Sequence, residues 1–146
     1  MIDIIAFLLA CVLAAIALLH LYWALGGFWP GHDEPSLAQA VVGTAGIRHM
    51  PPVWMTAAVV LALLAAALWP LMWAALVPYA LPQTLVVLGM WVLATVFLLR
   101  GIAGYTPVFG PDRVQEPFLS LNRRLYAPLC LVIGAGFVLL IVLARL

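Results

Sequence analysis

The side chains of this chain that could do chemistry are few: His20, Trp23, Arg100, Asn122, Arg123 and Tyr126. An arginine side chain binds anionic groups, asparagine and tyrosine orient such groups by hydrogen bonds, and a histidine side chain exchanges a proton near neutral pH. We therefore expect Arg100 and Arg123 to hold an anionic group. Asn122 and Tyr126 would orient that group, and His20 would sense or move a proton.

Each of these side chains also has a purely structural interpretation. Arg100 can extend its guanidinium to lipid headgroups while its aliphatic stem stays in the membrane. His20, Asn122 and Tyr126 can hydrogen-bond neighbouring helices, as polar residues in transmembrane bundles commonly do. Trp23 is typical of the aromatic belt at a membrane surface, although its ring could instead stack on a ligand. The residue types alone leave both interpretations open.

The composition restricts the class of protein to which these residues belong. Of the 146 residues, 68% are hydrophobic and 8% are charged, whereas a soluble domain carries about 25% charged residues. This excludes a soluble globular domain, and the high hydrophobicity excludes a disordered chain. Nucleic-acid binding is also excluded, because the net charge is +1, lysine is absent and the arginines form no long run.

Four segments are long and apolar enough to cross a bilayer, which takes about 20 residues of helix. They run from about 4 to 25, 53 to 77, 81 to 102 and 125 to 144. Backbone polar groups in lipid must bond internally, and no strand-like alternation is present, so we predict an all-α bundle of four transmembrane helices. We treat residues 1–146 as a single domain. Pro70 predicts a kink or an early end of the second helix.

Two long loops, about 26–52 and 103–124, follow the first and third spans and therefore lie at one end of the bundle. We expect both loops to be structured. Asp33 and Pro35 predict the start of a short helix that ends at Gly43. Five of the six arginines lie on or beside these loops, which by the positive-inside rule places the long loops in the cytoplasm and both termini outside.

The polar candidates are expected to meet beneath these loops. A helical rise of about 1.5 Å per residue puts His20, Arg100 and Asn122 near the loop-side boundary of their spans. On the last span, a spacing of four residues extends from Asn122 through Tyr126 to Cys130 and predicts one stripe. The leading hypothesis is a membrane protein that binds a lipid or a small anionic or amphipathic molecule in a pocket at this end.

Two other functions stay open. One is a transferase-like membrane enzyme acting at the inner face, with His20 or Tyr126 as its acid–base or oxyanion-stabilising group. The other is a structural or accessory subunit of a membrane complex. The three histidines lack a short metal-binding spacing, so no metal site is predicted, and no cofactor is identified. Expected partners are membrane lipid, a small-molecule ligand, and a second copy or a subunit of a membrane complex. Gly134 and Gly136 permit close helix contact, either within one chain or between chains.

Three segments carry a resemblance to a known family. They are LHLYWALGG at 19–27 with the following WP at 29–30, SLAQAVVG at 36–43, and LNRRLYAPLC at 121–130, of which the last is the most specific. The chain resembles an uncharacterised family of small four-helix bacterial membrane proteins, described as a domain of unknown function. The resemblance spans nearly the whole chain and implies the four-helix fold and a bacterial inner membrane. It implies no activity.

Overall fold

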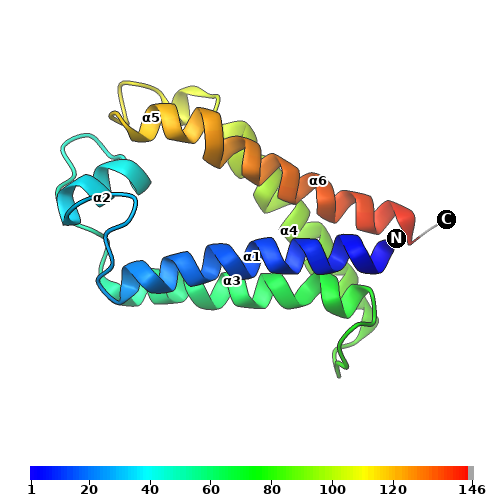
Figure 1. Ribbon diagram of the computed structural model, residues 1–146. Helices are drawn as coiled ribbons and strands as arrows, with labels where there is room; N and C mark the ends of the chain where they lie inside the picture. Colours follow the sequence, from blue (N-terminus) through cyan, green and yellow to red (C-terminus); the bar gives the residue numbers. More distant parts are fainter. Residues whose placement is uncertain (145–146) are drawn as a thin grey trace.

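The computed structural model describes residues 1–144, and four long apolar helices dominate it (Figure 1). Each is long and apolar enough to cross a membrane, and the described residues form no strand. These observations confirm the predicted all-α fold of a four-helix membrane protein. The helices are α1 (Ile2–Ala24), α3 (Val53–Trp73), α4 (Gln83–Ala103), and a last helix made of α5 (Phe118–Leu121), the π-helical segment η2 (Asn122–Tyr126) and α6 (Ala127–Leu143).

Two of the predicted span boundaries differ from the structure, and the other two spans agree to within two residues. The second span ends at Trp73 rather than residue 77, one turn after Pro70, whose missing N–H weakens the helix. The last span begins at Phe118 rather than near residue 125. Its first turn is stabilised by the carboxylate of Glu116, which accepts hydrogen bonds from the backbone N–H and the hydroxyl of Ser120 at 3.1 and 2.9 Å.

The long helices associate mainly as two pairs, α1 with α3 and α4 with α6. The pairs diverge toward the end that carries the long loops (Figure 1). Glycines bring α4 and α6 close together, because a Cβ atom on Gly101 would lie 2.6 Å from Leu131, and one on Gly134 would lie 2.7 Å from Leu98. Such close backbone approach is typical of helix packing in lipid, where van der Waals contact drives association.

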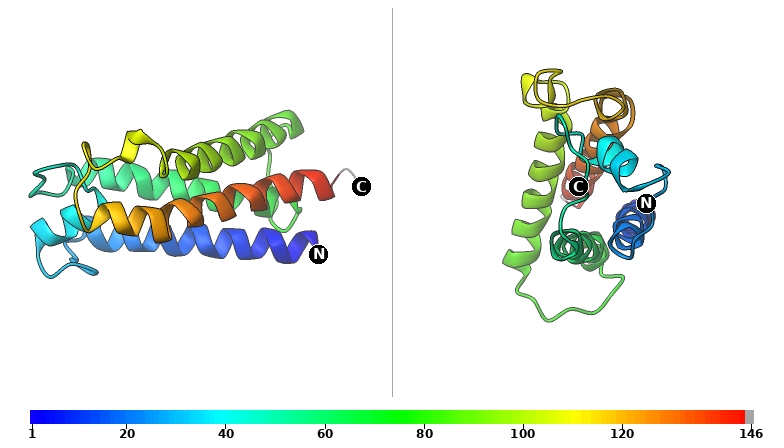
Figure 2. Two further views of the ribbon diagram at one scale, coloured as in Figure 1. Left: turned by 90° about the horizontal axis from the view of Figure 1, so that it is seen from above. Right: turned by 90° about the vertical axis from the view of Figure 1, so that its left-hand side faces the viewer.

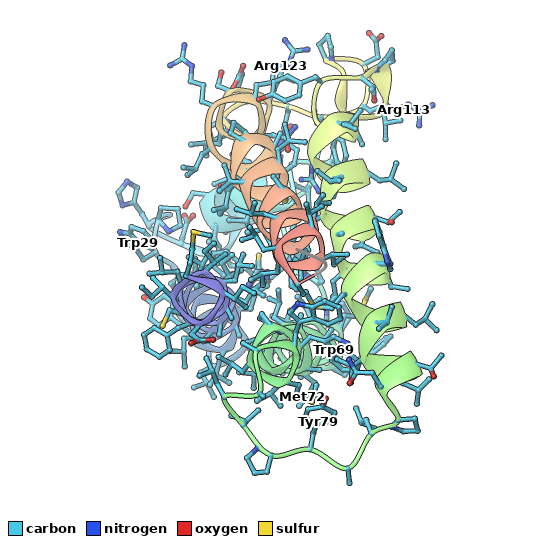
Figure 3. The ribbon with its side chains drawn as sticks, turned by 90° about the vertical axis from the view of Figure 1, so that its right-hand side faces the viewer. Trp29, Trp69, Met72, Tyr79, Arg113 and Arg123 are labelled. Carbon is cyan, nitrogen blue, oxygen red and sulfur yellow. The ribbon has the colours of Figure 1, made fainter. Side chains whose placement is uncertain are left out.

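The opposite end of the bundle, where α1 begins and α6 ends (Figure 2), contains a core of buried apolar side chains. Indole N–H groups also fasten helices to one another there. The side chain of Trp69 donates to the carbonyl of Val86 at 3.1 Å, and that of Trp73 donates to the carbonyl of Leu140 at 3.2 Å. Figure 3 shows Trp69 between α3 and α4. Unfilled space therefore remains mainly at the loop end.

The first long loop contains the short helix α2 (Glu34–Val41), which confirms the prediction from sequence. Asp33 caps its N-terminus by accepting a hydrogen bond from the backbone N–H of Ser36 at 2.9 Å. Hydrogen bonds from the hydroxyl and the backbone N–H of Ser36 hold the pKa of Asp33 below its usual range. Helix α2 lies across the wide end of the bundle, between α1 and the last helix (Figures 1 and 2).

The two long loops are joined to each other. Thr44 and Val114 form an antiparallel bridge, and the backbone N–H of Gln115 donates to the carbonyl of Gly43 at 2.9 Å. The side-chain carbonyl of Gln115 accepts from the backbone N–H of Gly46 at 3.1 Å. These contacts connect the two helix pairs across the end at which they diverge.

We predict that Gly43→Ala destabilises this loop junction more than Gly46→Ala. Both glycines have positive φ, at 74° and 79°, so a side chain at either site costs about 1–2 kcal/mol. A methyl group at residue 43 would also overlap the ring of Phe118, whereas residue 46 has no atom within 4 Å. Overpacking adds about 1–3 kcal/mol, so Gly43→Ala should lower the free energy of unfolding by about 2–5 kcal/mol.

Denaturation of the purified variants in one detergent, followed by circular dichroism, measures this difference. Gly46→Ala is the matched control for backbone strain. Equal losses in the two variants would contradict the predicted role of the Gly43–Phe118 contact.

Candidate functional site

The diverging helix pairs line a partly open cavity of about 260 Å³ near the loop end. We call it the inner cavity. Its wall comes from all four membrane helices and from α2. Four of the six candidate residues line it, namely His20, Trp23, Arg100 and Tyr126, together with Ile16, Val41, Leu63, Phe97, Leu129, Cys130 and Ile133.

Arg100 contributes the cationic group of the inner cavity from the last turn of α4. Its Nη2 donates to Oδ1 of Asn122 at 3.0 Å, and its Cζ lies 4.4 Å from the centroid of the Phe109 ring. Its Nη1 is buried and has no hydrogen-bond partner in the described part of the chain. Both contacts are with neutral groups, so the guanidinium of this half-buried residue lacks a compensating negative charge.

No carboxylate of the described residues lies within ion-pair distance of Arg100. In residues 1–144 the only such contact joins Nδ1 of His49 and Oε1 of Glu34, 3.6 Å apart. A buried donor without an acceptor costs about 1–3 kcal/mol, and more when the donor is charged. Nη1 is therefore a charged donor that the described residues leave without an acceptor.

Asn122 is fully buried and lies behind Arg100 rather than in the wall of the inner cavity. Its Oδ1 accepts from Arg100, and its Nδ2 donates to the carbonyl of Gly104 at 3.1 Å. A Cβ atom on Gly104 would lie 2.5 Å from the side chain of Ala127, so the absence of a side chain there permits this approach. Asn122 thus positions the guanidinium of Arg100.

Tyr126 faces the inner cavity although Asn122 does not. The two residues were expected on one stripe, but the helix between them is π-helical, with the N–H of Ala127 bonded to the carbonyl of Asn122 five residues back. The wider turn changes the angle between these two side chains from that of a regular α-helix. The Tyr126 hydroxyl donates to the carbonyl of Ala40 in α2 at 3.1 Å, which ties α2 to the last helix.

His20 and Trp23 form the α1 side of the inner cavity. Nδ1 of His20 lies 2.8 Å from the carbonyl of Ile16, and since a carbonyl only accepts, Nδ1 carries the proton and Nε2 is left as an acceptor. The rings of His20 and Trp23 lie with centroids 4.8 Å apart. The indole N–H of Trp23 donates to the carbonyl of Trp29 at 2.7 Å, so this tryptophan is anchored to the first loop.

Arg123 is not brought to the inner cavity. Its side chain is exposed, and in Figure 3 it lies at the upper edge of the view, outside the helices. Its backbone carbonyl accepts a hydrogen bond from the Tyr105 hydroxyl at 3.0 Å. The structure therefore places Arg100 alone, and not Arg100 with Arg123, beside the cavity.

Two residues of the site were missed by the sequence analysis. Phe109 contacts Arg100 from the short 3-10 helix η1 (Pro107–Phe109), and the available signal was an aromatic residue between Pro107 and Gly110. Gly104 gave no separate signal, since many glycines lie in loops of this chain. Among the described residues, no group of three or more His, Cys, Asp or Glu side chains could hold a metal ion.

We predict that Arg100 and Asn122 are energetically coupled. Asn122→Leu removes a hydrogen bond to a charged group, so it should lower the free energy of unfolding by about 1.5–3 kcal/mol. In an Arg100→Met background the same change should cost less, because the charged donor is already gone. The double-mutant cycle, measured by denaturation in detergent, should give a coupling energy of about 1.5–3 kcal/mol.

Arg123→Met is the control for loss of an arginine at this end of the protein, and it should change stability by no more than about 0.5 kcal/mol. Strictly additive effects of the Arg100 and Asn122 changes would show that this hydrogen bond does not organise the site.

Comparison with known proteins gives one match. Residues 13–137 match the family model described as protein of unknown function (DUF3995), and this segment includes all six candidate residues. No curated protein and no solved structure matches the chain. The match confirms the family resemblance carried by the segments 19–27, 36–43 and 121–130. Because it spans far more than half of the chain, this four-helix membrane protein belongs to the DUF3995 family.

Proposed function

We propose that the protein binds an amphipathic molecule with an anionic head, a carboxylate or a phosphate, in the inner cavity. The head would lie at Arg100 and the apolar part against the remaining wall. The observation that carries this proposal is the half-buried Arg100, which lines the cavity with only neutral partners and has one buried N–H donor without an acceptor.

An anion would supply what Arg100 lacks. It would provide an acceptor for the buried N–H group and a negative charge for the guanidinium, and hydrogen bonds between charged groups are about twice as strong as neutral ones. An ionisable residue inside a membrane is costly and usually marks a ligand, an ion path or a paired charge. Paired charge is not available to Arg100 among the described residues, which favours a ligand.

The rest of the inner cavity selects the other part of the ligand. Ile16, Leu63, Phe97, Leu129 and Ile133 give it an apolar wall, which an ion without an apolar part would leave uncovered. Nε2 of His20 can accept a hydrogen bond from a hydroxyl or a protonated acid of the head. A ligand that fits this cavity therefore has an anionic head for Arg100 and an apolar part for these side chains. Such a molecule is an amphiphile.

A binding function is better supported than a transferase reaction. The hydroxyl proton of Tyr126 is already donated to the carbonyl of Ala40, which makes this residue a poor acid for catalysis. Cys130 and His20 also line the cavity. Apart from Arg100, the described residues that line it include no arginine, lysine or carboxylate that could assist them in a reaction. Arg100 is accounted for by binding alone.

We predict that the protein prefers anionic amphiphiles to a neutral one of equal chain length. Decanoate and decyl phosphate should bind at least about tenfold more tightly than decanol, which corresponds to about 1.4 kcal/mol. Arg100→Met should remove this preference, because it keeps an apolar side chain of similar length and deletes the charge. Titrations followed by intrinsic tryptophan fluorescence, with protein-free detergent subtracted, give the three affinities.

Arg123→Met should retain the preference, since its side chain is exposed outside the cavity. The comparison of decanoate with decyl phosphate identifies the head that the site favours. A folded wild-type protein that binds all three compounds equally, or an Arg100→Met variant that still prefers the anions, would refute the proposal.

The membrane orientation is part of the proposed function, because it decides from which side the site is reached. We place the protein in a bacterial inner membrane with its long loops in the cytoplasm. The support is the set of exposed arginines at the loop end, Arg48, Arg113, Arg123 and Arg124, since short loops rich in arginine stay on the cytoplasmic side.

Single cysteines test this orientation. In a background with Cys11 and Cys130 replaced by alanine, Ala45→Cys lies in an exposed long loop and Ala80→Cys in the exposed short connection. A membrane-impermeant maleimide added to intact spheroplasts should label Ala80→Cys, and should label Ala45→Cys only after the membrane is opened. The reverse pattern would overturn the orientation.

A further inference from the structure

A second cavity, of about 500 Å³, lies beside the inner cavity. We call it the outer cavity. It is bounded by α1, the first long loop, α2 and the α5–η2 segment. Trp23, Val41 and Tyr126 line both cavities, so these three side chains form a shared wall.

The outer cavity is mainly apolar and reaches the surface of the molecule. Leu19, Pro30, Leu121 and Leu125 contribute to its lining. Leu125 is 55% exposed, and Trp29, which also lines the cavity, is 64% exposed. Leu19 and Leu125 belong to helices that are long and apolar enough to cross a membrane, and Trp29 and Pro30 belong to the first long loop, so the outer cavity lies where these helices meet the loop end.

Each aromatic side chain of the shared wall is held by one hydrogen bond and one ring contact. The indole of Trp23 donates to the carbonyl of Trp29 and its ring contacts that of His20, and the hydroxyl of Tyr126 donates to the carbonyl of Ala40 and its ring contacts that of Phe118. A single hydrogen bond of this kind contributes about 0.5–1.5 kcal/mol. A rotation of either side chain would connect the two cavities and would give up one such hydrogen bond and one ring contact.

The volumes of the two cavities indicate which part of a ligand each of them could hold. Pockets for small molecules usually measure about 300–1,000 Å³. The inner cavity, at about 260 Å³, falls below that range, and the two cavities together fall within it. The inner cavity has room for the head and the first part of an apolar chain. Of the cavities that share wall residues with it, the outer cavity, at about 500 Å³, has more room for the rest of a longer chain than the cavity of about 220 Å³ that shares His20, Trp23 and Val41.

We infer that the ligand is a single-chain amphiphile whose chain passes Trp23 and Tyr126 into the outer cavity, so that Leu125 and Trp29 determine which chain lengths bind. This inference rests on the proposed function, because it takes the head to be at Arg100. It assigns the outer cavity a role in selecting the chain length of the ligand. It also makes the gap between α1 and the last helix the route by which the ligand enters from the bilayer.

Chain length tests the inference. Wild-type protein should bind hexadecanoate at least about tenfold more tightly than decanoate, because each added methylene group buried is worth up to about 0.8 kcal/mol. Leu125→Trp, which fills the outer cavity, should bind decanoate as the wild type does and lose the gain for hexadecanoate. Val132→Trp is the matched control, since Val132 is 68% exposed on α6 and lines neither cavity.

Equal binding of the two chain lengths by the wild type, or an unchanged gain in Leu125→Trp, would overturn the inference. These outcomes are distinct from failure of the proposed function, which would appear as decanoate binding that is no tighter than decanol binding. The decanoate–decanol comparison is therefore run on the same preparations.

A second measurement keeps the test valid if Leu125→Trp does not fold. Hexadecanoate brominated at its terminal carbon quenches nearby tryptophans, and Trp29 lines only the outer of the two cavities. Trp29→Phe should remove a measurable share of the quenching seen in the wild type, whereas Trp54→Phe, at an exposed position remote from both cavities, should change it less. Equal loss in the two variants would overturn the inference.

Discussion

The hydrogen bond between Arg100 and Asn122 is the interaction on which the loop end of the bundle depends. It requires α4 to approach the last helix closely, which Gly104 permits. It also directs Asn122 toward α4, while the π-helical turn directs Tyr126 toward α2. One charged side chain thus links α4, the last helix and, through Phe109, the second long loop. Within lipid, where unpaired polar groups are costly, such a link restricts how these elements can be arranged.

Convergence at one end and divergence at the other create the cavities. The core and two indole hydrogen bonds hold the helices together near the chain termini, and at the loop end the bridge between the loops spans a gap that membrane helices do not fill. The cavities therefore follow from the angle between two helix pairs, and not from a missing side chain. Their polar residues come from several elements, which explains why charge, aromatic surface and apolar surface meet there.

Much of the fold could be predicted from the sequence, because apolar length and short-range capping signals are local. The four spans and the start of α2 at Asp33 are of this kind. For the site, the sequence predicted only the depth in the membrane at which the polar residues lie. Sequence spacing could not reveal the π-helical turn, which depends on packing against α4, nor the outward direction of Arg123. The hydrogen bond between Tyr126 and Ala40 joins residues 86 positions apart, so no local sequence pattern could predict it.

The pairing of neighbouring spans has a consequence for biogenesis. Since α1 packs mainly with α3, and α4 with α6, each pair is contiguous in the chain and can associate as a hairpin soon after it leaves the ribosome. The first hairpin carries His20 and Trp23, and the second carries Arg100 and Tyr126. Neither hairpin alone supplies the whole wall of the inner cavity or of the outer cavity. These two cavities therefore form only at the final step of assembly, when the two hairpins meet and their loops join.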